Sequence, residues 1–155
     1  HELFRKIGEF RHEAESVIIV GGGRIAERLA LELARMHIHS TIIERDPARC
    51  RVMKTLLPEA TIICADGTKP DVLREEGLPE ADALVTLTES DETNLISCMV
   101  GRKLGATHTI ARVRDEEYYQ DVALLQDELG LSLSINPERT SAKEEYTPPF
   151  DLTGV

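Results

Sequence analysis

The sequence has few cysteines, no long apolar run and fewer basic than acidic residues. Its three cysteines, Cys50, Cys64 and Cys98, lie far apart and form no Cys-x-x-Cys pair. This pattern favours reduced thiols in a cytosolic protein over a disulfide framework. Cys64 and Cys98 fall on apolar faces, so we expect them in the core. The five histidines show no spacing typical of metal ligands, and no metal site is predicted.

The charge balance and the apolar runs exclude further classes. Eighteen basic against 28 acidic residues give a formal charge of −10, which disfavours nucleic acid and anionic membrane surfaces as direct partners. No apolar run approaches the roughly 20 residues that span a bilayer, and no signal peptide is expected. The 155 residues, 41% of them hydrophobic, suit one domain with a sizeable core. The chain begins at a histidine, so we expect a fragment of a longer protein.

The most informative stretch, residues 16–46, has the order strand, glycine turn, helix, strand, acid. A short apolar run precedes three consecutive glycines at 21–23, and a helical pattern of apolar residues follows them. A second apolar run then ends on Glu44. This order is typical of a dinucleotide-binding βαβ unit.

The glycine turn fits the pattern G-x-G-x-x-G/A, with Ala26 in the third place. Gly21 permits a tight turn, Gly23 lets a pyrophosphate approach the backbone, and Ala26 lets the helix pack closely on the strand. The N–H groups at the helix start favour phosphates, and Arg24 is a candidate for a charge-assisted bond to them. The residues predicted to form this phosphate turn are Gly21, Gly22, Gly23, Arg24, Ile25 and Ala26.

Glu44 is the predicted ribose ligand. It lies 23 residues after Gly21, near the usual spacing of about 20, and a carboxylate there can accept from both ribose hydroxyls. It also argues against NADP, because two unit charges about 4 Å apart repel by roughly 4 kcal/mol at an effective dielectric near 20. The adjacent Arg45 can offset part of this repulsion, so NADP is disfavoured rather than excluded.

The rest of the chain continues the alternation of strands and helices. Further strands are predicted at 61–65, 83–87, 109–113 and 131–135, with helices at 47–57, 70–76, 91–104 and 116–129. Six strands alternating with helices predict an α/β, Rossmann-like, doubly wound parallel sheet with strand order 3-2-1-4-5-6. We expect this nucleotide-binding domain over 16–137, a connector helix over 1–15, and a short helix with a linker or tail over 138–155.

Polar residues follow the third and fourth predicted strands, where ligands bind in open α/β sheets. Asp66, followed by Gly67, either contacts the adenine side of a nucleotide or is a turn residue that caps the next helix. Thr88 and Asn94 border the same crevice and are candidates for contacts with ribose, phosphate or nicotinamide. Nearby, Asp91 is interpreted as a helix N-cap.

Arg112 lies within the fifth predicted strand, close to the expected edge of the sheet. Its side chain is either solvated or ion-paired in the crevice. The sequence does not separate these two alternatives.

Four motifs carry a resemblance to a known family. They are VIIVGGGRIAERLA, TIIERD, CADGTKPDVLREEGL and ADALVTLTESDETNLISCMVGRKLGA, in this order. The chain resembles, over about residues 10–144, the nucleotide-binding N-terminal half of RCK (or KTN) domains. It is most similar to the TrkA-type peripheral subunits of Trk potassium uptake systems.

The resemblance implies a regulatory protein rather than a catalyst. Such a protein lies in the cytoplasm at the inner face of the membrane, assembles into dimers or rings, and gates a potassium transporter or channel subunit. NAD or NADH, or alternatively ADP or ATP, would bind in the crevice. In this chain the resemblance puts the phosphates at residues 21–26, the ribose at Glu44, the adenosine at Asp66, and the pyrophosphate or second ribose near Thr88.

Two other classes share the glycine turn. An NAD-dependent oxidoreductase needs an acid–base group over the nicotinamide, often Tyr with Lys four residues later. Here Tyr118 and Tyr119 are followed at that spacing by Val122 and Ala123. A methyltransferase also pairs a glycine turn with an acid, although GGGRIA opening a helix suits a pyrophosphate better than a sulfonium ligand. The oxidoreductase cofactor domain is the main alternative.

Overall fold

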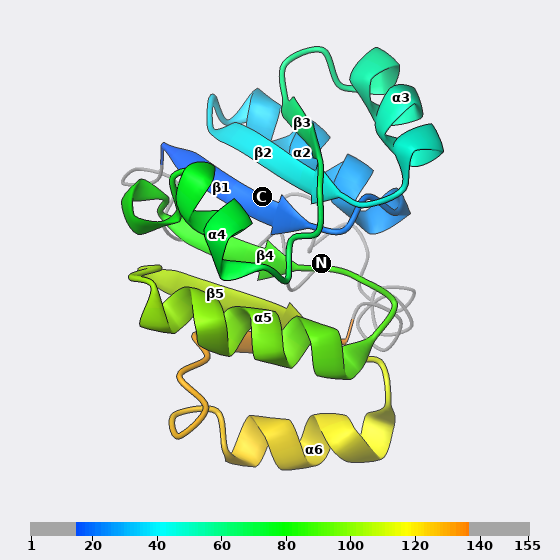
Figure 1. Cartoon of the computed structure of the whole chain (residues 1–155). Helices are drawn as coiled ribbons and strands as arrows, with labels where there is room; N and C mark the ends of the chain where they lie inside the picture. Colours follow the sequence, from blue (N-terminus) through cyan, green and yellow to red (C-terminus); the bar gives the residue numbers. More distant parts are fainter. Residues whose placement is uncertain (1–14, 137–155) are drawn as a thin grey trace.

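A six-stranded parallel sheet organises the protein. The computed structural model describes residues 15–136 (Figure 1). The strands are β1 Ser16–Val20, β2 His39–Glu44, β3 Thr61–Cys64, β4 Ala83–Thr86, β5 His108–Arg112 and β6 Leu133–Ile135. All neighbouring strands pair in parallel, in the order β3-β2-β1-β4-β5-β6. The predicted fold class and strand order are therefore confirmed, while the predicted connector over 1–15, apart from its last residue, and the tail over 138–155 lie outside the described residues.

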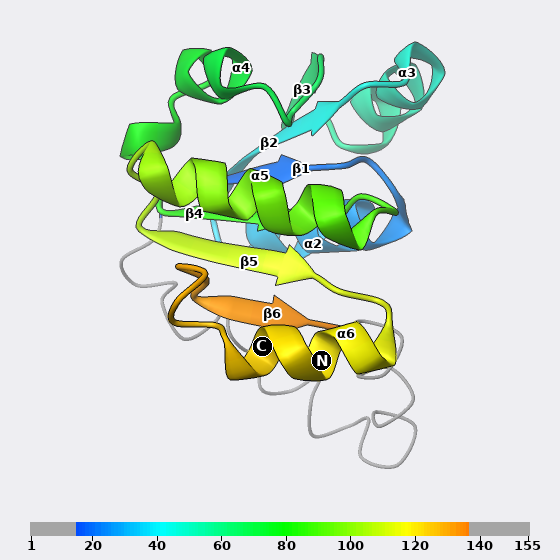
Figure 2. The same cartoon turned by 60° about the horizontal axis from the view of Figure 1, so that its bottom comes forward.

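Helices cover both faces of the sheet (Figure 2). They are α2 Arg24–Arg35, α3 Pro47–Leu56, α4 Pro70–Glu75, α5 Asp91–Lys103 and α6 Glu116–Leu124, with a short 3-10 turn η1 at Leu78–Glu80. One buried cluster joins the sheet to α2 and α3, and two others join the opposite face to α4, α5 and α6. Within residues 15–136, no helix combines the length and apolar character that a bilayer crossing requires.

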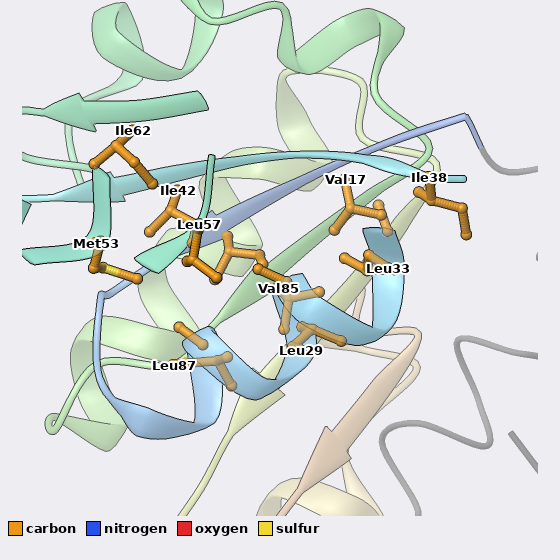
Figure 3. Packing of buried hydrophobic residues seen from close by; sticks show 14 of the residues in the cluster. Val17, Leu29, Leu33, Ile38, Ile42, Met53, Leu57, Ile62, Val85 and Leu87 are labelled. Atoms are coloured by element: carbon orange, nitrogen blue, oxygen red, sulfur yellow. The ribbon is translucent and has the colours of Figure 1, made fainter. Parts of the chain in front are cut away.

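The central strands are buried between the two layers of helices. β1 reads Ser-Val-Ile-Ile-Val and is buried on both faces over its last four residues, as expected for a parallel strand between two helical layers. Figure 3 shows side chains of β1, β2 and β4 meeting those of α2 and α3. Backbone bonds from Gly21 N to Ile43 O (2.9 Å) and from Leu87 N to Val20 O (2.8 Å) keep the carboxyl ends of these three strands level.

The start of α5 differs from the prediction. Its N-cap is Ser90, whose hydroxyl accepts from the N–H of Thr93 at 3.2 Å. Asp91 is instead the first residue of the helix, and its carboxylate accepts from the N–H groups of Arg114 (2.8 Å) and Asp115 (3.0 Å). Asp91 therefore ties down the loop after β5, a long-range role that the local sequence does not reveal.

The predicted helix over 116–129 ends earlier than expected. α6 stops at Leu124, turns follow to Gly130 at φ +72°, and β6 begins at residue 133 rather than 131. Leu124 and Leu125 are 82% and 47% exposed. These largely exposed apolar side chains add little packing energy to the helix. The helix therefore ends at Leu124, although the apolar spacing in the sequence continues beyond it.

The cysteines are distributed differently from the prediction. Cys98 is buried, as expected, but Cys64 is exposed and Cys50 is buried in its place. Cys64 is the last residue of β3, which is an edge strand of the sheet formed by residues 15–136. Cys50 lies on the face of α3 that packs on the sheet.

Candidate functional site

An open cavity of about 560 Å³ lies at the carboxyl ends of β1 to β4. Its polar and glycine wall comes from the loops after these strands and from the starts of α3 and α5. These residues are Gly21, Gly22, Gly23, Glu44, Arg45, Asp46, Arg49, Asp66, Gly67, Thr68, Thr88, Glu89, Ser90 and Thr93. The sheet thus brings together predicted residues from four separate segments.

The first two glycines of the turn are required by the fold itself. Gly21 has φ +106°, and a Cβ there would lie 3.0 Å from backbone atoms of Leu87 and Thr88. A Cβ on Gly22 would lie 2.6 Å from the sulfur of Met53 and 2.9 Å from a carboxylate oxygen of Glu44. Larger residues at these two positions would clash inside the protein, whether or not a ligand binds.

Gly23 is different, because nothing in the fold requires it. Its φ of −83° suits any residue, and within residues 15–136 no protein atom lies within 4 Å of the position that a Cβ would take. Gly23 lines the cavity and is the N-cap of α2, whose first turn receives no hydrogen bond from a capping side chain. The backbone is therefore open to the cavity where a helix N-terminus favours an anion.

Glu44 is held in place at the end of β2. Its Oε1 accepts from Gly22 N at 2.6 Å and its Oε2 accepts from Asp46 N at 2.7 Å. Each carboxylate oxygen has capacity for a further bond. The side chain is half-buried and lines the cavity next to the glycine turn. A hydroxyl donor in the cavity would therefore meet an oriented acceptor.

Asp66 has a turn function in addition to its place in the cavity wall. Its Oδ1 accepts from the N–H of Thr68 at 3.0 Å and from the Thr68 hydroxyl at 2.7 Å, and these bonds lower the pKa of the carboxyl group. The N-cap of α4 is Lys69 rather than Asp66. The following residue, Gly67, passes so close to β1 that a Cβ would lie 2.7 Å from Val20.

Asn94, a predicted ligand contact, is not among the residues that line the cavity. It is fully buried, and its Oδ1 accepts from the N–H (2.9 Å) and the hydroxyl (2.6 Å) of Thr88. Its Nδ2 donates to Thr88 O (3.0 Å) and Arg112 O (2.9 Å). With two bonds accepted and two donated, the amide is fully used within the protein. Asn94 thus holds Thr88, which does line the cavity.

The predicted residues at the start of α2 are also absent from the cavity wall. Ala26 is fully buried, in agreement with its expected packing role, and Ile25 packs against the same cluster of α2 and α3. Arg24 is exposed. These three residues form the first turn of α2 after Gly23, and none of them is among the residues that line the cavity.

Arg49, in the first turn of α3, lines the cavity although the sequence reasoning missed it. Its Nε donates to the carbonyl of Gly22, and its guanidinium pairs with Glu27 on α2. A signal was available, because α3 starts at the same edge of the sheet where β2 ends. A basic residue in the first turn after Asp46-Pro47 is thereby directed towards the glycine turn.

Arg112 is ion-paired rather than solvated. It is 7% exposed, and its NH1 group lies 3.3 Å from Thr88 O and 3.9 Å from a carboxylate oxygen of Glu89. The arginine therefore holds the loop after β4 through Thr88 and Glu89, which agrees with the ion-pair alternative.

Comparison with known proteins places the fold in a family. The family model described as the TrkA-N domain matches residues 17–137. The chain belongs to the TrkA-N family. It is 38% identical to the Trk system potassium uptake protein TrkA of Halomonas elongata over 125 residues, which are 79% of this chain and 27% of that protein. It is 34% identical to a TrkA homologue of Methanothermobacter thermautotrophicus over 126 residues, 81% of this chain and 56% of that protein.

Solved TrkA-N and RCK structures share the fold. The TrkA-N domain of the inner membrane protein ybaL from Escherichia coli superimposes with a TM-score of 0.72 at 16% identity, covering 86% of this chain and 96% of that one. The GsuK channel bound to NAD gives 0.66 at 17% identity, covering 79% and 21%. GsuK bound to ADP gives 0.69 at 24% identity, covering 92% and 36%. The chain thus spans only part of its curated relatives and of this channel.

Proposed function

We propose that this chain is the adenine-nucleotide-binding domain of a regulatory subunit of a potassium transport system. NAD or NADH is the proposed ligand, with ADP or ATP as alternatives. The observation that carries the proposal is Gly23, a glycine that the fold does not need and that opens the start of α2 to the cavity. A phosphate placed there would meet backbone N–H groups with no side chain in between.

The neighbouring residues fit the other parts of a dinucleotide. Glu44, oriented by two backbone N–H groups, would accept from the hydroxyls of the adenosine ribose. Asp66 and Gly67 would lie at the adenosine, and Thr88 near the pyrophosphate or the second ribose. Arg45 and Arg49 line the same wall and would offset phosphate charge. Arg24, exposed at the helix start, would add a charge-assisted bond to the phosphates.

Regulation is the role that family membership supports. Two relatives are named as potassium uptake proteins, and an RCK channel of similar fold has been solved with NAD and with ADP. In this proposal the domain self-associates into dimers or rings in the cytoplasm and contacts a potassium transporter or channel in the membrane. Nucleotide binding would then bias a two-state assembly, which requires different affinities for the two states.

Thermal unfolding against NAD, NADH, NADP, ADP and ATP tests the binding step. A ligand at 1,000 times its dissociation constant stabilises the fold by about 4 kcal/mol. We expect a shift with NAD(H) or ADP/ATP and a much smaller one with NADP. No shift with any of these nucleotides would contradict the proposal, and steady NADH turnover with a carbonyl substrate would favour the oxidoreductase alternative.

The regulatory step is tested in the full-length protein. A strain that carries Gly23→Asp should lose nucleotide-dependent potassium uptake, because a carboxylate in the phosphate position repels the ligand. Normal potassium uptake by this strain would contradict a regulatory role.

A further inference from the structure

Two cysteines meet behind Glu44, on the side of the sheet covered by α3. Glu44 and Cys64 are paired in the parallel register of β2 and β3, so their side chains leave the same face of the sheet. The preceding residues on that face, Ile42 and Ile62, belong to the buried cluster that contains Cys50. Cys50 on α3 and Cys64 on the edge strand β3 therefore both lie near the end of β2, on the same face of the sheet.

The thiol contacts agree with this placement. Cys50 Sγ donates to the carbonyl oxygen of Glu44 at 3.1 Å, and Cys64 Sγ lies 3.9 Å from the next carbonyl oxygen, that of Arg45. Burial, and then the hydrogen bond with the Cys64 thiol, raise the pKa of Cys50 to about 11. The two thiols thus contact consecutive carbonyl groups, those of Glu44 and Arg45, although 14 positions separate the cysteines in the sequence.

The two cysteines differ in accessibility, and the third is an internal control. Cys64 is exposed while Cys50 is 3% exposed. Cys98 is fully buried in a different cluster, between α5, α6 and β5. A reagent in solution therefore meets Cys64 first, and Cys98 has no nearby thiol partner within the described part of the chain.

We propose that Cys50 and Cys64 form a redox-active dithiol that a small-molecule disulfide converts to an intramolecular disulfide, which weakens nucleotide binding at Glu44. The effect on binding rests on the function proposed above, whereas the oxidation of the pair does not.

The chemistry proceeds by two thiol–disulfide exchanges. The Cys64 thiolate attacks one sulfur of the reagent, the S–S bond of the reagent breaks, and one thiol leaves. The Cys50 thiolate then attacks Cys64 Sγ, the protein disulfide forms, and the second thiol leaves. The two cysteines lose two electrons, the reagent disulfide gains them, and the two cysteine protons end on the released thiols.

Disulfide formation would disturb the groups that orient Glu44, the proposed ribose ligand. The Cys50 thiol hydrogen that binds Glu44 O is lost, and the sulfurs close to a covalent distance of about 2.05 Å. This movement draws the start of α3 towards β3. That segment includes the N–H of Asp46, which orients the Glu44 carboxylate. Loss of one hydrogen bond to a charged group corresponds to about tenfold in affinity.

The test treats the reduced protein with 2-hydroxyethyl disulfide and maps the products by mass spectrometry. We expect a Cys50–Cys64 cross-linked peptide, a mass loss of two hydrogens, and an unmodified Cys98. The variant Cys64→Ser should form no internal disulfide, Cys50→Ala should stop at a stable mixed disulfide on Cys64, and Cys98→Ala should behave like the unmodified protein. Stable mixed disulfide on Cys64 in the unmodified protein, or no reaction, would overturn the dithiol.

Titration of NAD against the reduced and oxidised proteins tests the coupling. We expect about tenfold weaker binding after oxidation, restored by dithiothreitol and absent in Cys64→Ser. Equal affinity of both forms would overturn the coupling. If the reduced protein binds none of the nucleotides, the proposed function and the coupling fail together, while the cross-link map still decides on the dithiol.

Discussion

The two sides of the cavity use their polar groups in opposite ways. The side built by the loops after β1, β2 and β3 presents an open backbone at Gly23 and an oriented carboxylate at Glu44. On the side built by the loop after β4, the polar groups bind one another, because the Asn94 amide makes all of its hydrogen bonds with Thr88 and Arg112. The first side has polar groups that can bind a ligand. The polar groups of the second side instead hold the cavity wall in place.

This difference shows that the place of a polar residue in the sheet does not by itself tell whether its hydrogen-bonding groups are available to a ligand. Glu44 is the last residue of β2 and Asn94 lies in the first turn of α5 after β4, so both are near the carboxyl edge of the sheet, where ligands are expected. Only Glu44 lines the cavity, while Asn94 is buried and saturated. A polar residue at this edge is therefore a candidate ligand only if its hydrogen-bonding capacity is not already used inside the protein.

The largest expected effect concerns the charge of Glu44. Glu44→Gln should raise the affinity for NADP relative to NAD by up to about a thousandfold, because it removes a repulsion of roughly 4 kcal/mol from a 2′-phosphate. Titration of both nucleotides against both proteins measures the ratio. An unchanged ratio would mean that Glu44 does not contact the ribose.

The next effect tests the side of the cavity built by the loop after β4. Asn94→Ala should destabilise the fold by about 3 kcal/mol, since buried groups of Thr88 and Arg112 lose their partner. Urea unfolding measures the loss. The matched control is Thr93→Ala, one residue earlier and facing the cavity, which should change stability by less than about 0.5 kcal/mol. Equal stability of Asn94→Ala and the unmodified protein would refute the supporting role of Asn94.

A smaller effect separates the glycines of the open side. Gly23→Ala should lower nucleotide affinity about tenfold or more, or 1.4 kcal/mol, because the new methyl group fills space next to the start of α2. Its cost in stability should stay below about 1 kcal/mol, as for other N-cap changes. Gly21→Ala is the control and should destabilise the fold by more than about 1 kcal/mol, because its φ is left-handed. Isothermal titration and urea unfolding measure both quantities.

The smallest effect is the pH dependence at Asp66. Its folded-state pKa is lowered by the bonds from Thr68, so its stabilising contribution is complete above the unfolded pKa of about 3.9 and is lost as the pH falls through the lower folded value. Between pH 6 and pH 3, the unmodified protein should therefore lose more stability than Asp66→Asn. Denaturant unfolding at both pH values gives the difference, and parallel losses would remove the role assigned to these bonds.

The prediction from sequence succeeded where local patterns carry the information. Asp46-Pro47 predicted the start of α3, and the Asp46 side chain does accept from the N–H of Ala48. The prediction was wrong at Asp91, where long-range hydrogen bonds decide the outcome, and at the end of α6, where the apolar side chains of Leu124 and Leu125 are largely exposed. Arg49 was missed because its approach to Gly22 depends on how α3 lies against the glycine turn.

Local patterns in the sequence were sufficient to predict the order of the strands, the glycine turn and the acid at the end of β2. These follow from apolar periodicity and from residue types that only certain turns accept. The three-dimensional arrangement was needed to show which of the three glycines a ligand can approach, that Asn94 is buried and supports Thr88, and that Cys50 and Cys64 contact consecutive carbonyl groups. Each of these depends on atoms distant in sequence that the sheet brings together, and no local pattern encodes that proximity.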